Sequence, residues 1–287
     1  MWKIILNIKF ELEFNNIIMI VGIDIGSTTT KAVGVQNGVI VQTVKTRAFD
    51  AVTSATGAFG KMIMESRAKI SDVEKIIVTG AGSLKINSEI FGIPTSKIDE
   101  IEAIGIGGMF LSKRDNIIIT NIGTGTSVIE ATKEKITHLG GTGVGGGTII
   151  GLAKELIKTQ TFDNILNLAD KGDLTQVDLL IEDISDLEIS FLDRKATAAN
   201  FGKMLDTARK EDIALAIINL VYQVIGVISM FAAKSRGHDI VLITGNGSKN
   251  RIGRKILEEV SRMYGINFIF PIEAEFATAI GAALTQS

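Results

Sequence analysis

Two short turns in this 287-residue chain carry the residue types that hold a polyphosphate. The first is Asp24-Ile25-Gly26-Ser27-Thr28-Thr29-Thr30-Lys31, and the second is Asn121-Ile122-Gly123-Thr124-Gly125-Thr126-Ser127. Both offer backbone N–H groups and clustered hydroxyls, and the first adds a carboxylate and an ammonium. Because such groups bind phosphate oxygens and Mg²⁺, we expect two sites for the phosphates of a nucleotide.

Each turn follows an apolar run and precedes a hairpin, so each should lie at the end of a buried strand. The first follows residues 17–25, and Asn37-Gly38 behind it marks a tight hairpin. The second follows residues 117–120, with a hairpin turn at 133–135. This repetition indicates two related lobes whose hairpins face each other. The expected phosphate contacts are Asp24, Gly26, Ser27, Thr28, Thr29, Lys31, Gly123, Thr124, Gly125, Thr126 and Ser127.

The composition argues against several classes of protein. The length suits two compact domains better than one. A net charge of -2 provides no basic footprint, so we expect no nucleic-acid partner. The absence of cysteine excludes a disulfide, a thiolate zinc site and a cysteine-held iron–sulfur cluster.

Two apolar segments bear on the location of the protein. Charged residues interrupt the segment from Trp2 to Met19, which argues against a signal peptide, and Met19 could be the true start after an extension over residues 1–18. Residues 213–233 contain no formal charge and could span a bilayer. Polar side chains recur along this run, however, so we expect a buried helix, no membrane association and a cytoplasmic protein.

Two further glycine-rich stretches are candidates for ligand contacts. Residues 140–147 precede a predicted helix that ends near Lys158, and the N–H groups at its start could hold an anion or polar groups of a substrate; the alternative is a mobile loop without a ligand. Gly245-Asn246-Gly247 follows a predicted strand and would suit an adenine or ribose contact. The expected sites are Gly145, Gly146, Gly147, Gly245, Asn246 and Gly247 for the nucleotide, and Gly140, Gly141, Thr142 and Gly143 for the substrate.

Glu100 lies where a predicted strand gives way to a helix, a position where active-site groups gather. An acid in the first turn of a helix also stabilises the helix dipole, and the residues alone favour that structural role. Ahead of it, a short helix is expected to end at Gly92. Residues 162–195 are acidic and mixed, and no pattern in them indicates a function.

With these motifs placed, the chain resembles the actin-like ATPase superfamily, which includes sugar kinases, acetate kinase and heat-shock chaperones. Within that superfamily it is most similar to the type II pantothenate kinases. The resemblance implies an α/β fold of two actin-like, ribonuclease H-like lobes with a nucleotide cleft between them, divided into 19–115 and 116–287. It covers about residues 19–285 and is carried by Gly22 to Gly26, Thr79-Gly80, 121–127, 140–152, 197–202 and 275–282.

The resemblance also assigns roles to single residues. Glu100 matches the general base that acts on the hydroxyl of pantothenate, which overrides its structural interpretation. Asp24 matches the acid that holds Mg²⁺ through water, and Lys31 matches the basic residue near the phosphates. The implied activity is ATP-dependent phosphorylation of pantothenate, the first step of coenzyme A biosynthesis, in a homodimer.

His138 departs from the family pattern, because an arginine usually precedes the glycine-rich stretch. We treat His138 as a second catalytic candidate, although an imidazole cannot grip a phosphoryl group in the bidentate way of a guanidinium. A same-fold kinase acting on a related hydroxyl compound therefore stays open. So does an ATPase switch that drives a partner protein, since residues 22–31 also resemble the activator ATPases of dehydratases; those activators hold an iron–sulfur cluster on cysteines.

Overall fold

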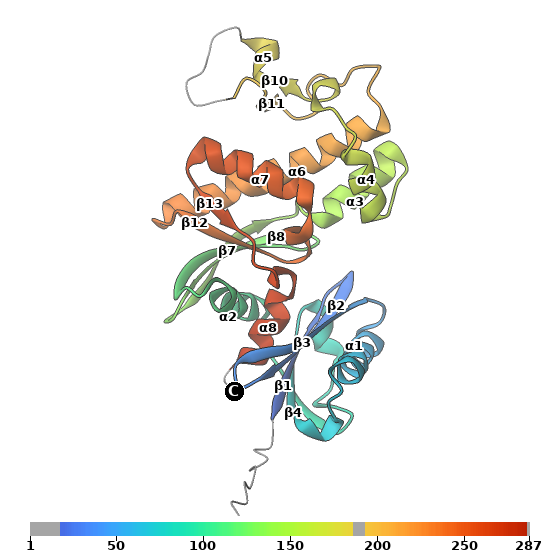
Figure 1. The fold of residues 1–287 in the computed structure, drawn as a ribbon, viewed down its shortest axis with the longest axis vertical. Helices are drawn as coiled ribbons and strands as arrows, with labels where there is room; N and C mark the ends of the chain where they lie inside the picture. The colour runs from blue at the N-terminus through green and yellow to red at the C-terminus, as the bar shows by residue number, and fades with distance from the viewer. Residues whose placement is uncertain (1–17, 186–192, 286–287) are drawn as a thin grey trace, which may run out of the picture.

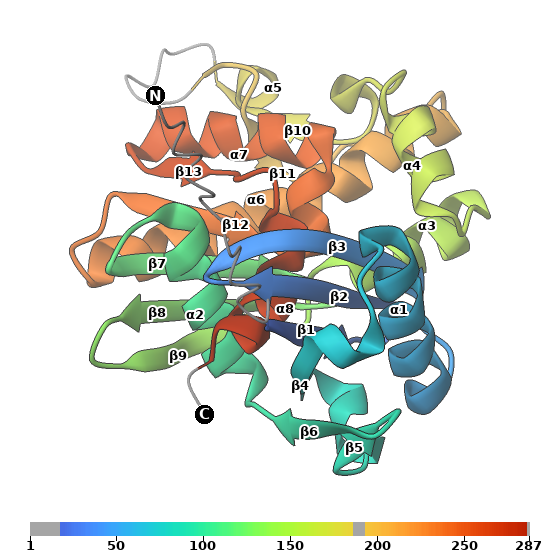
Figure 2. The ribbon, with the colours of Figure 1, turned by 60° about the horizontal axis from the view of Figure 1, so that its bottom comes forward.

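The computed structural model describes residues 18–185 and 193–285 (Figure 1). The expected N-terminal extension therefore lies, apart from Ile18, outside the described residues. Two β-sheets stack along the long axis of the molecule, with helices around and between them (Figures 1 and 2). The predicted two-lobed α/β architecture is confirmed.

The first sheet contains both strands of the first predicted hairpin. Its strand order is β3-β2-β1-β4-β6-β5, and β1 pairs antiparallel with β2 and parallel with β4. Val21 and Ile23 on β1 are fully buried because helix α1 covers one face of the sheet. The strands are β1 (Met19–Ile25), β2 (Thr29–Gln36), β3 (Val39–Arg47), β4 (Val73–Thr79), β5 (Glu89–Ile90) and β6 (Ile93–Lys97).

The second sheet repeats this pattern. In the order β13-β12-β7-β8-β9, β7 pairs antiparallel with β8 and parallel with β12, just as β1 pairs with β2 and β4. The repeated turn therefore belongs to a repeated fold unit. The strands are β7 (Asn116–Ile122), β8 (Thr126–Thr132), β9 (Ile136–Thr142), β12 (Ile240–Thr244) and β13 (Asn267–Ile269).

A small outer sheet pairs β10 (Leu179–Leu180) with β11 (Thr197–Ala199). The helices belong to both lobes. Asp50 caps α1 by accepting from the N–H groups of Val52 and Thr53. The helices are α1 (Ala51–Ser66), α2 (Glu100–Ser112), α3 (Gly146–Ile157), α4 (Phe162–Ala169), α5 (Ile181–Ile184), α6 (Lys210–Ser235), α7 (Arg251–Tyr264) and α8 (Ala277–Leu284).

Helices α2 and α8 lie side by side between the sheets (Figure 1). Ile104 of α2 packs with the second sheet, whereas Ala279, Ile280 and Ala283 of α8 pack on Val33 and Val35 of the first. The last helix, which the sequence assigns to the second lobe, is thus packed on the first. The division of the chain at 115/116 stays a prediction.

The predicted short helix before Gly92 is wrong. The structure has a 3₁₀ turn, η2 (Ala81–Lys85), followed by a hairpin of β5 and β6. Phe91 and Gly92 form its tip, with φ angles of 53° and 76°. Two successive residues with positive φ are typical of a tight hairpin turn. The sequence does not indicate this turn, because Gly92 favours a positive φ but Phe91 does not.

The apolar run 213–233 lies in α6, which is the one helix in the described part of the chain that is long and apolar enough to cross a membrane. Its most apolar window is 61% buried, against α3, α4 and α7 in the core of the second lobe. Its polar residues have partners there: the Ser229 and Thr120 hydroxyls lie 2.8 Å apart, and Asn219 donates to Asp178 at 2.8 Å. These observations describe a core helix.

Residues 197–202, expected either to line a cleft or to connect elements, anchor the outer region to α6. The buried carboxylate of Asp178 accepts from Thr197, Asn200, Asn219 and the N–H of Phe201. Thr197 also lines a cavity of about 390 Å³ beside α6 and α7. That cavity shares no lining residue with the two cavities described below.

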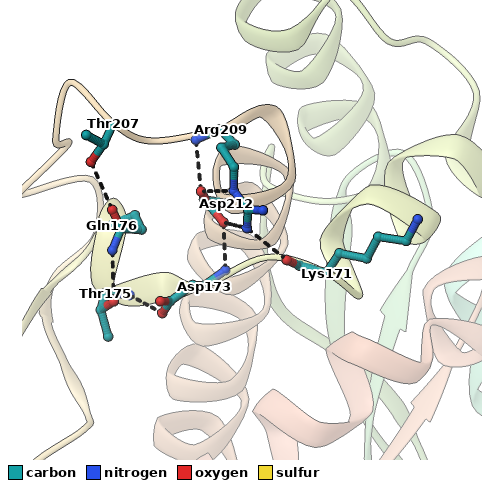
Figure 3. A network of polar contacts seen from close by, with 7 residues as sticks. All are labelled: Lys171, Asp173, Thr175, Gln176, Thr207, Arg209 and Asp212. Carbon is teal, nitrogen blue, oxygen red and sulfur yellow. Dashed lines mark hydrogen bonds and ion pairs between the residues drawn. The ribbon is translucent and has the colours of Figure 1, made fainter.

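A polar network at the start of α6 fixes the loop that follows α4 (Figure 3). The fully buried carboxylate of Asp212 accepts from the N–H of Asp173 at 2.9 Å and from the guanidinium of Arg209 at 2.9 and 3.2 Å. Arg209 also donates to the carbonyl of Lys171. The hydrogen bond from Arg209 is the largest of the effects that lower the pKa of Asp212 to about 2.

This pKa predicts an acid-sensitive contribution to stability. A carboxylate with a folded-state pKa of about 2 and an ordinary value of 3.8 stabilises the fold above pH 3.8, and loses that contribution as the pH falls toward 2. Asp212→Asn should lower the free energy of unfolding at pH 7 by roughly 1 to 2 kcal/mol, with a smaller difference from the wild type near pH 3. Urea unfolding across this pH range measures it. Asp206→Asn, which removes an exposed carboxylate from the segment just before α6, is the control; an equal loss in both variants would contradict the prediction.

Candidate functional site

The two predicted phosphate turns meet across the space between the lobes. The hydroxyl oxygens of Ser27 and Thr124 lie 2.9 Å apart. The side-chain amide of Asn246 in the second lobe donates to the Thr29 hydroxyl at 3.1 Å. The expectation that the turns face each other is therefore confirmed, and residues about a hundred positions apart in the chain form one surface.

A backbone hydrogen bond closes each turn, and a glycine that follows a neighbouring strand packs against it. Gly26 donates to the carbonyl of Thr29, and Gly123 donates to that of Gly125. Gly80 and Gly245, with φ angles of 82° and 78°, follow β4 and β12. A Cβ at either glycine would lie 2.8 Å from the carboxylate of Asp24 or the amide oxygen of Asn121, respectively. These positions require glycine.

A second sequence repeat, separate from the two phosphate turns, surrounds these glycines. Thr79-Gly80-Ala81-Gly82-Ser83 and Thr244-Gly245-Asn246-Gly247-Ser248 share the pattern Thr-Gly-x-Gly-Ser. In both, the serine N–H donates to the first glycine carbonyl, at 3.0 and 3.1 Å. Each lobe therefore contributes two turns to the site, one before a hairpin and one after a parallel strand.

The turns enclose a polar cavity of about 350 Å³. Glu100, the first residue of α2, lines it together with the phosphate turns, and Asp99 caps the helix. Thr142 and Thr278 add hydroxyls. The predicted residues that line this cavity are Asp24, Gly26, Ser27, Thr28, Thr29, Lys31, Glu100, Gly123, Thr124, Gly125, Thr126, Ser127, Thr142, Gly245 and Asn246.

An adjoining cavity of about 420 Å³ is largely apolar. It shares Thr28, Gly123, Thr124 and Asn246 with the polar cavity, so these four residues lie between the two. The Tyr222 hydroxyl donates to the Gly247 carbonyl at 2.7 Å in its wall. An apolar space next to phosphate turns suits a nucleotide base. Its apolar lining is Ile122, Ile149, Ile150, Phe162, Leu166 and Tyr222.

Three ionisable side chains in the polar cavity have shifted pKa values. Burial raises the pKa of Asp24 and lowers that of Lys31, and each partly offsets the shift of the other across 3.9 Å. Glu100 is exposed to solvent, but the walls of the cavity remove part of its hydration and raise its pKa, and the charges of Asp24 and Asp99 raise it further. A carboxylate with a raised pKa is better matched to accepting a proton at neutral pH.

The polar cavity also suits a magnesium ion bound mainly by phosphates. No cluster of three or more His, Cys, Asp or Glu side chains that could hold a metal occurs among residues 18–185 and 193–285. Asp24 is buried, with 8% of the residue exposed, and lines a cavity together with several hydroxyls. Mg²⁺ usually takes one or two carboxylates, several waters and phosphate oxygens, so this oxygen donor set fits.

The structure separates several predicted residues from this site. His138 is exposed on β9, opposite Ile129 of β8, and lines neither cavity. Its catalytic role stays a prediction that the geometry does not support. Gly140, Gly141, Gly143 and Gly145 likewise line neither cavity, while Gly146, Gly147 and Gly247 line the apolar one.

The prediction that the N–H groups at the start of α3 are free to bind a ligand is wrong. Gly146 and Gly147 donate instead to the carbonyls of Gly123 and Thr124, both at 2.9 Å. A Cβ at Gly145 would lie 2.6 Å from the Thr124 carbonyl. The glycines are thus needed because the backbone of α3 packs directly on the second phosphate turn. The stretch supports that turn and offers no anion site of its own through Gly146 and Gly147.

Solved structures of low sequence identity share this fold. The activator of the 2-hydroxyisocaproyl-CoA dehydratase from Clostridium difficile, with bound ADPNP, aligns with a TM-score of 0.65 at 21% identity, covering 93% of each chain. A ROK family glucokinase from Streptomyces griseus, in complex with glucose and AMPPNP, aligns with a TM-score of 0.58 at 15% identity, covering 92% of this chain and 98% of that one. The fold and the paired turns define an actin-like ATPase-fold protein.

The sequence comparisons then give the family. The Fumble family model matches residues 30–284, and the chain belongs to this family. The type II pantothenate kinase of Bacillus anthracis is 30% identical over 244 residues, which cover 79% of this chain and 88% of that protein. That of Oceanobacillus iheyensis is 33% identical over 218 residues, covering 73% and 81%. The chain is a kinase that binds ATP and acts on a small molecule.

Proposed function

We propose that this kinase transfers the γ-phosphoryl group of ATP to the primary hydroxyl of pantothenate, the first step of coenzyme A biosynthesis. The observation that carries the proposal is the meeting of the two phosphate turns in one cavity with Glu100, in a chain of this family. The apolar cavity takes the base, and the shared residues Thr28, Gly123, Thr124 and Asn246 take the phosphates. The acceptor then lies on the Glu100 side.

The transfer requires the acceptor hydroxyl to approach the γ-phosphorus in line with the leaving oxygen of ADP. A bond forms between the hydroxyl oxygen and phosphorus, the bond to the ADP oxygen breaks, and the hydroxyl proton passes to the Glu100 carboxylate. The turns supply N–H and hydroxyl donors to the phosphates, so positioning and charge neutralisation account for most of the rate.

Asp24 would hold Mg²⁺ through water, and Ser27 and Thr124, which line the same cavity, would contribute hydroxyls. When bound, the ion would neutralise part of the charge on the transferring phosphoryl group. Lys31, buried beside Asp24, would keep that carboxylate ionised and oriented toward the cavity. The two lobes would exclude water from the cleft, which otherwise competes as the acceptor.

The family resemblance further supports a homodimer in the cytoplasm. The net charge of -2 argues against a nucleic-acid partner, and the burial of α6 argues against a membrane-spanning role for that helix. Because His138 stands where the family usually has arginine, a kinase for a related hydroxyl compound is the first alternative. An activator-type ATPase is the second: it has a matching fold, but the chain lacks the cysteines that hold the cluster of such activators.

A panel of hydroxyl acceptors distinguishes these functions. With Mg·ATP present, we expect ADP release to depend on pantothenate, which should have the highest kcat/KM in a panel that includes pantetheine, glycerol and glucose. Phosphorylation is measured by mass spectrometry of the product, and reactions without an acceptor serve as the control. A higher kcat/KM for another hydroxyl compound would replace the proposed acceptor. Hydrolysis that needs a protein partner and no small acceptor would replace the kinase proposal by the switch.

A further inference from the structure

Two lysines from opposite sides of the cleft line the apolar cavity near the phosphate turns. Lys45 lies on β3 of the first sheet, and Lys249 ends the 3₁₀ turn η4 (Asn246–Lys249) of the second lobe. Their side chains are 41% and 47% exposed, so neither is buried in the wall of the cavity. The function proposed above assigns no role to either residue.

Both lysines share one counterion. The Glu275 carboxylate lies 2.8 Å from the Lys45 ammonium and 3.4 Å from that of Lys249, in the 3₁₀ turn η5 (Ala274–Phe276). Burial acts to raise the pKa of Glu275, but the hydrogen bond from Lys45 and the charges of the lysines outweigh it and lower the pKa. Two ammonium groups therefore flank the single Glu275 carboxylate, and Asp163 is the acid that lines the same cavity with them.

The cationic side chains of the cleft indicate which groups are available to bind a polyphosphate. Among the described residues that line the two cavities, the cations are Lys31, Lys45 and Lys249. Lys31 is 4% exposed and paired with Asp24, so it offsets a carboxylate rather than a ligand. A triphosphate brings several negative charges, and Lys45 and Lys249 are the cations left to meet them.

We propose that Lys45 and Lys249 form a cation pair that binds the α- and β-phosphates of the nucleotide from both lobes. Both residues line the apolar, base-side cavity together with Thr28, Gly123 and Thr124, and neither lines the Glu100 cavity. The pair therefore acts on the phosphates nearest the nucleoside and lies apart from the transferring group. In the structure, Glu275 is the counterion that these phosphates would replace.

Single substitutions Lys45→Met and Lys249→Met test the pair. We expect each to raise the dissociation constants of Mg·ADP and Mg·ATP about tenfold, because each removes a charged hydrogen bond to phosphate. The inhibition constant of adenosine should change less than about twofold. Calorimetry and steady-state kinetics measure these quantities. Lys61→Met, which removes the same charge from an exposed pair on α1, is the matched control.

Adenosine separates a phosphate contact from damage to the cavity. If adenosine loses affinity as much as ADP does, or if ADP affinity is unchanged, the cation pair is wrong. Lys45→Arg and Lys249→Arg keep the charge and should retain ADP affinity within about threefold, and Lys→Gln variants replace any Met variant that does not fold. The inference rests on the nucleotide-binding part of the proposed function. If the wild-type protein gives no heat with Mg·ATP, both the proposed function and the cation pair are overturned. If the wild type binds ATP and the variants bind it equally well, only the cation pair is overturned.

Discussion

Replacing Glu100 with Gln should lower kcat at least about a hundredfold while Mg·ATP affinity changes less than about twofold. The substitution keeps the size of the side chain but removes the carboxylate that would accept the proton. Glu100 lines the polar cavity and not the base-side cavity, so nucleotide contacts should survive. Single-turnover phosphorylation of pantothenate measures the chemical step, and calorimetry measures nucleotide affinity.

The control for this experiment lies on the same helix. Glu102 is also in the first turn of α2 but lines a separate groove with Lys133 and Ile136. Glu102→Gln removes the same charge near the same helix dipole, so it reports the structural role that acids play at a helix start. We expect it to retain kcat within about threefold. Near-normal turnover in Glu100→Gln, or equal losses in both variants, would remove Glu100 from the mechanism.

The phosphate turns could be predicted because their signal is local. A strand, a glycine–hydroxyl turn and a hairpin occupy consecutive residues, and the same order occurs twice. Glu100 is different, because its cap by Asp99 looks like any helix start. Only its place in a family pattern, and then its position in the cavity, distinguishes it from Glu102.

The base-side cavity could not be predicted, because it forms from apolar residues of separate elements. Ile150, Phe162 and Tyr222 lie on α3, α4 and α6, and each looks like an ordinary core residue in its own helix. The glycines before α3 were predicted to contact a ligand, but a glycine that packs on another backbone has the same sequence pattern. The sequence indicates that the backbone of these glycines approaches another group closely. It does not distinguish a ligand from another stretch of backbone.

Gly281→Ala should destabilise the protein by about 3 kcal/mol and lower kcat as well, because it forces apart the two helices between the lobes. A Cβ at Gly281 on α8 would lie 1.8 Å from the Ala103 carbonyl on α2, and a Cβ at Gly107 would lie 1.9 Å from the Ala277 carbonyl. Both obstructions are backbone atoms, so a change of rotamer cannot relieve them.

The loss of kcat should follow from the same displacement. Glu100 begins α2 while its neighbours across the cleft belong to the sheets, so a shift of α2 against α8 moves the carboxylate relative to the phosphate turns. Gly57→Ala on α1, where an added Cβ would meet no atom within 4 Å, is the matched control and should stabilise by about 0.5 to 1 kcal/mol. Urea unfolding measures both variants. A Gly281→Ala protein as stable and active as the wild type would show that the crossing of α2 and α8 does not set the geometry of the site.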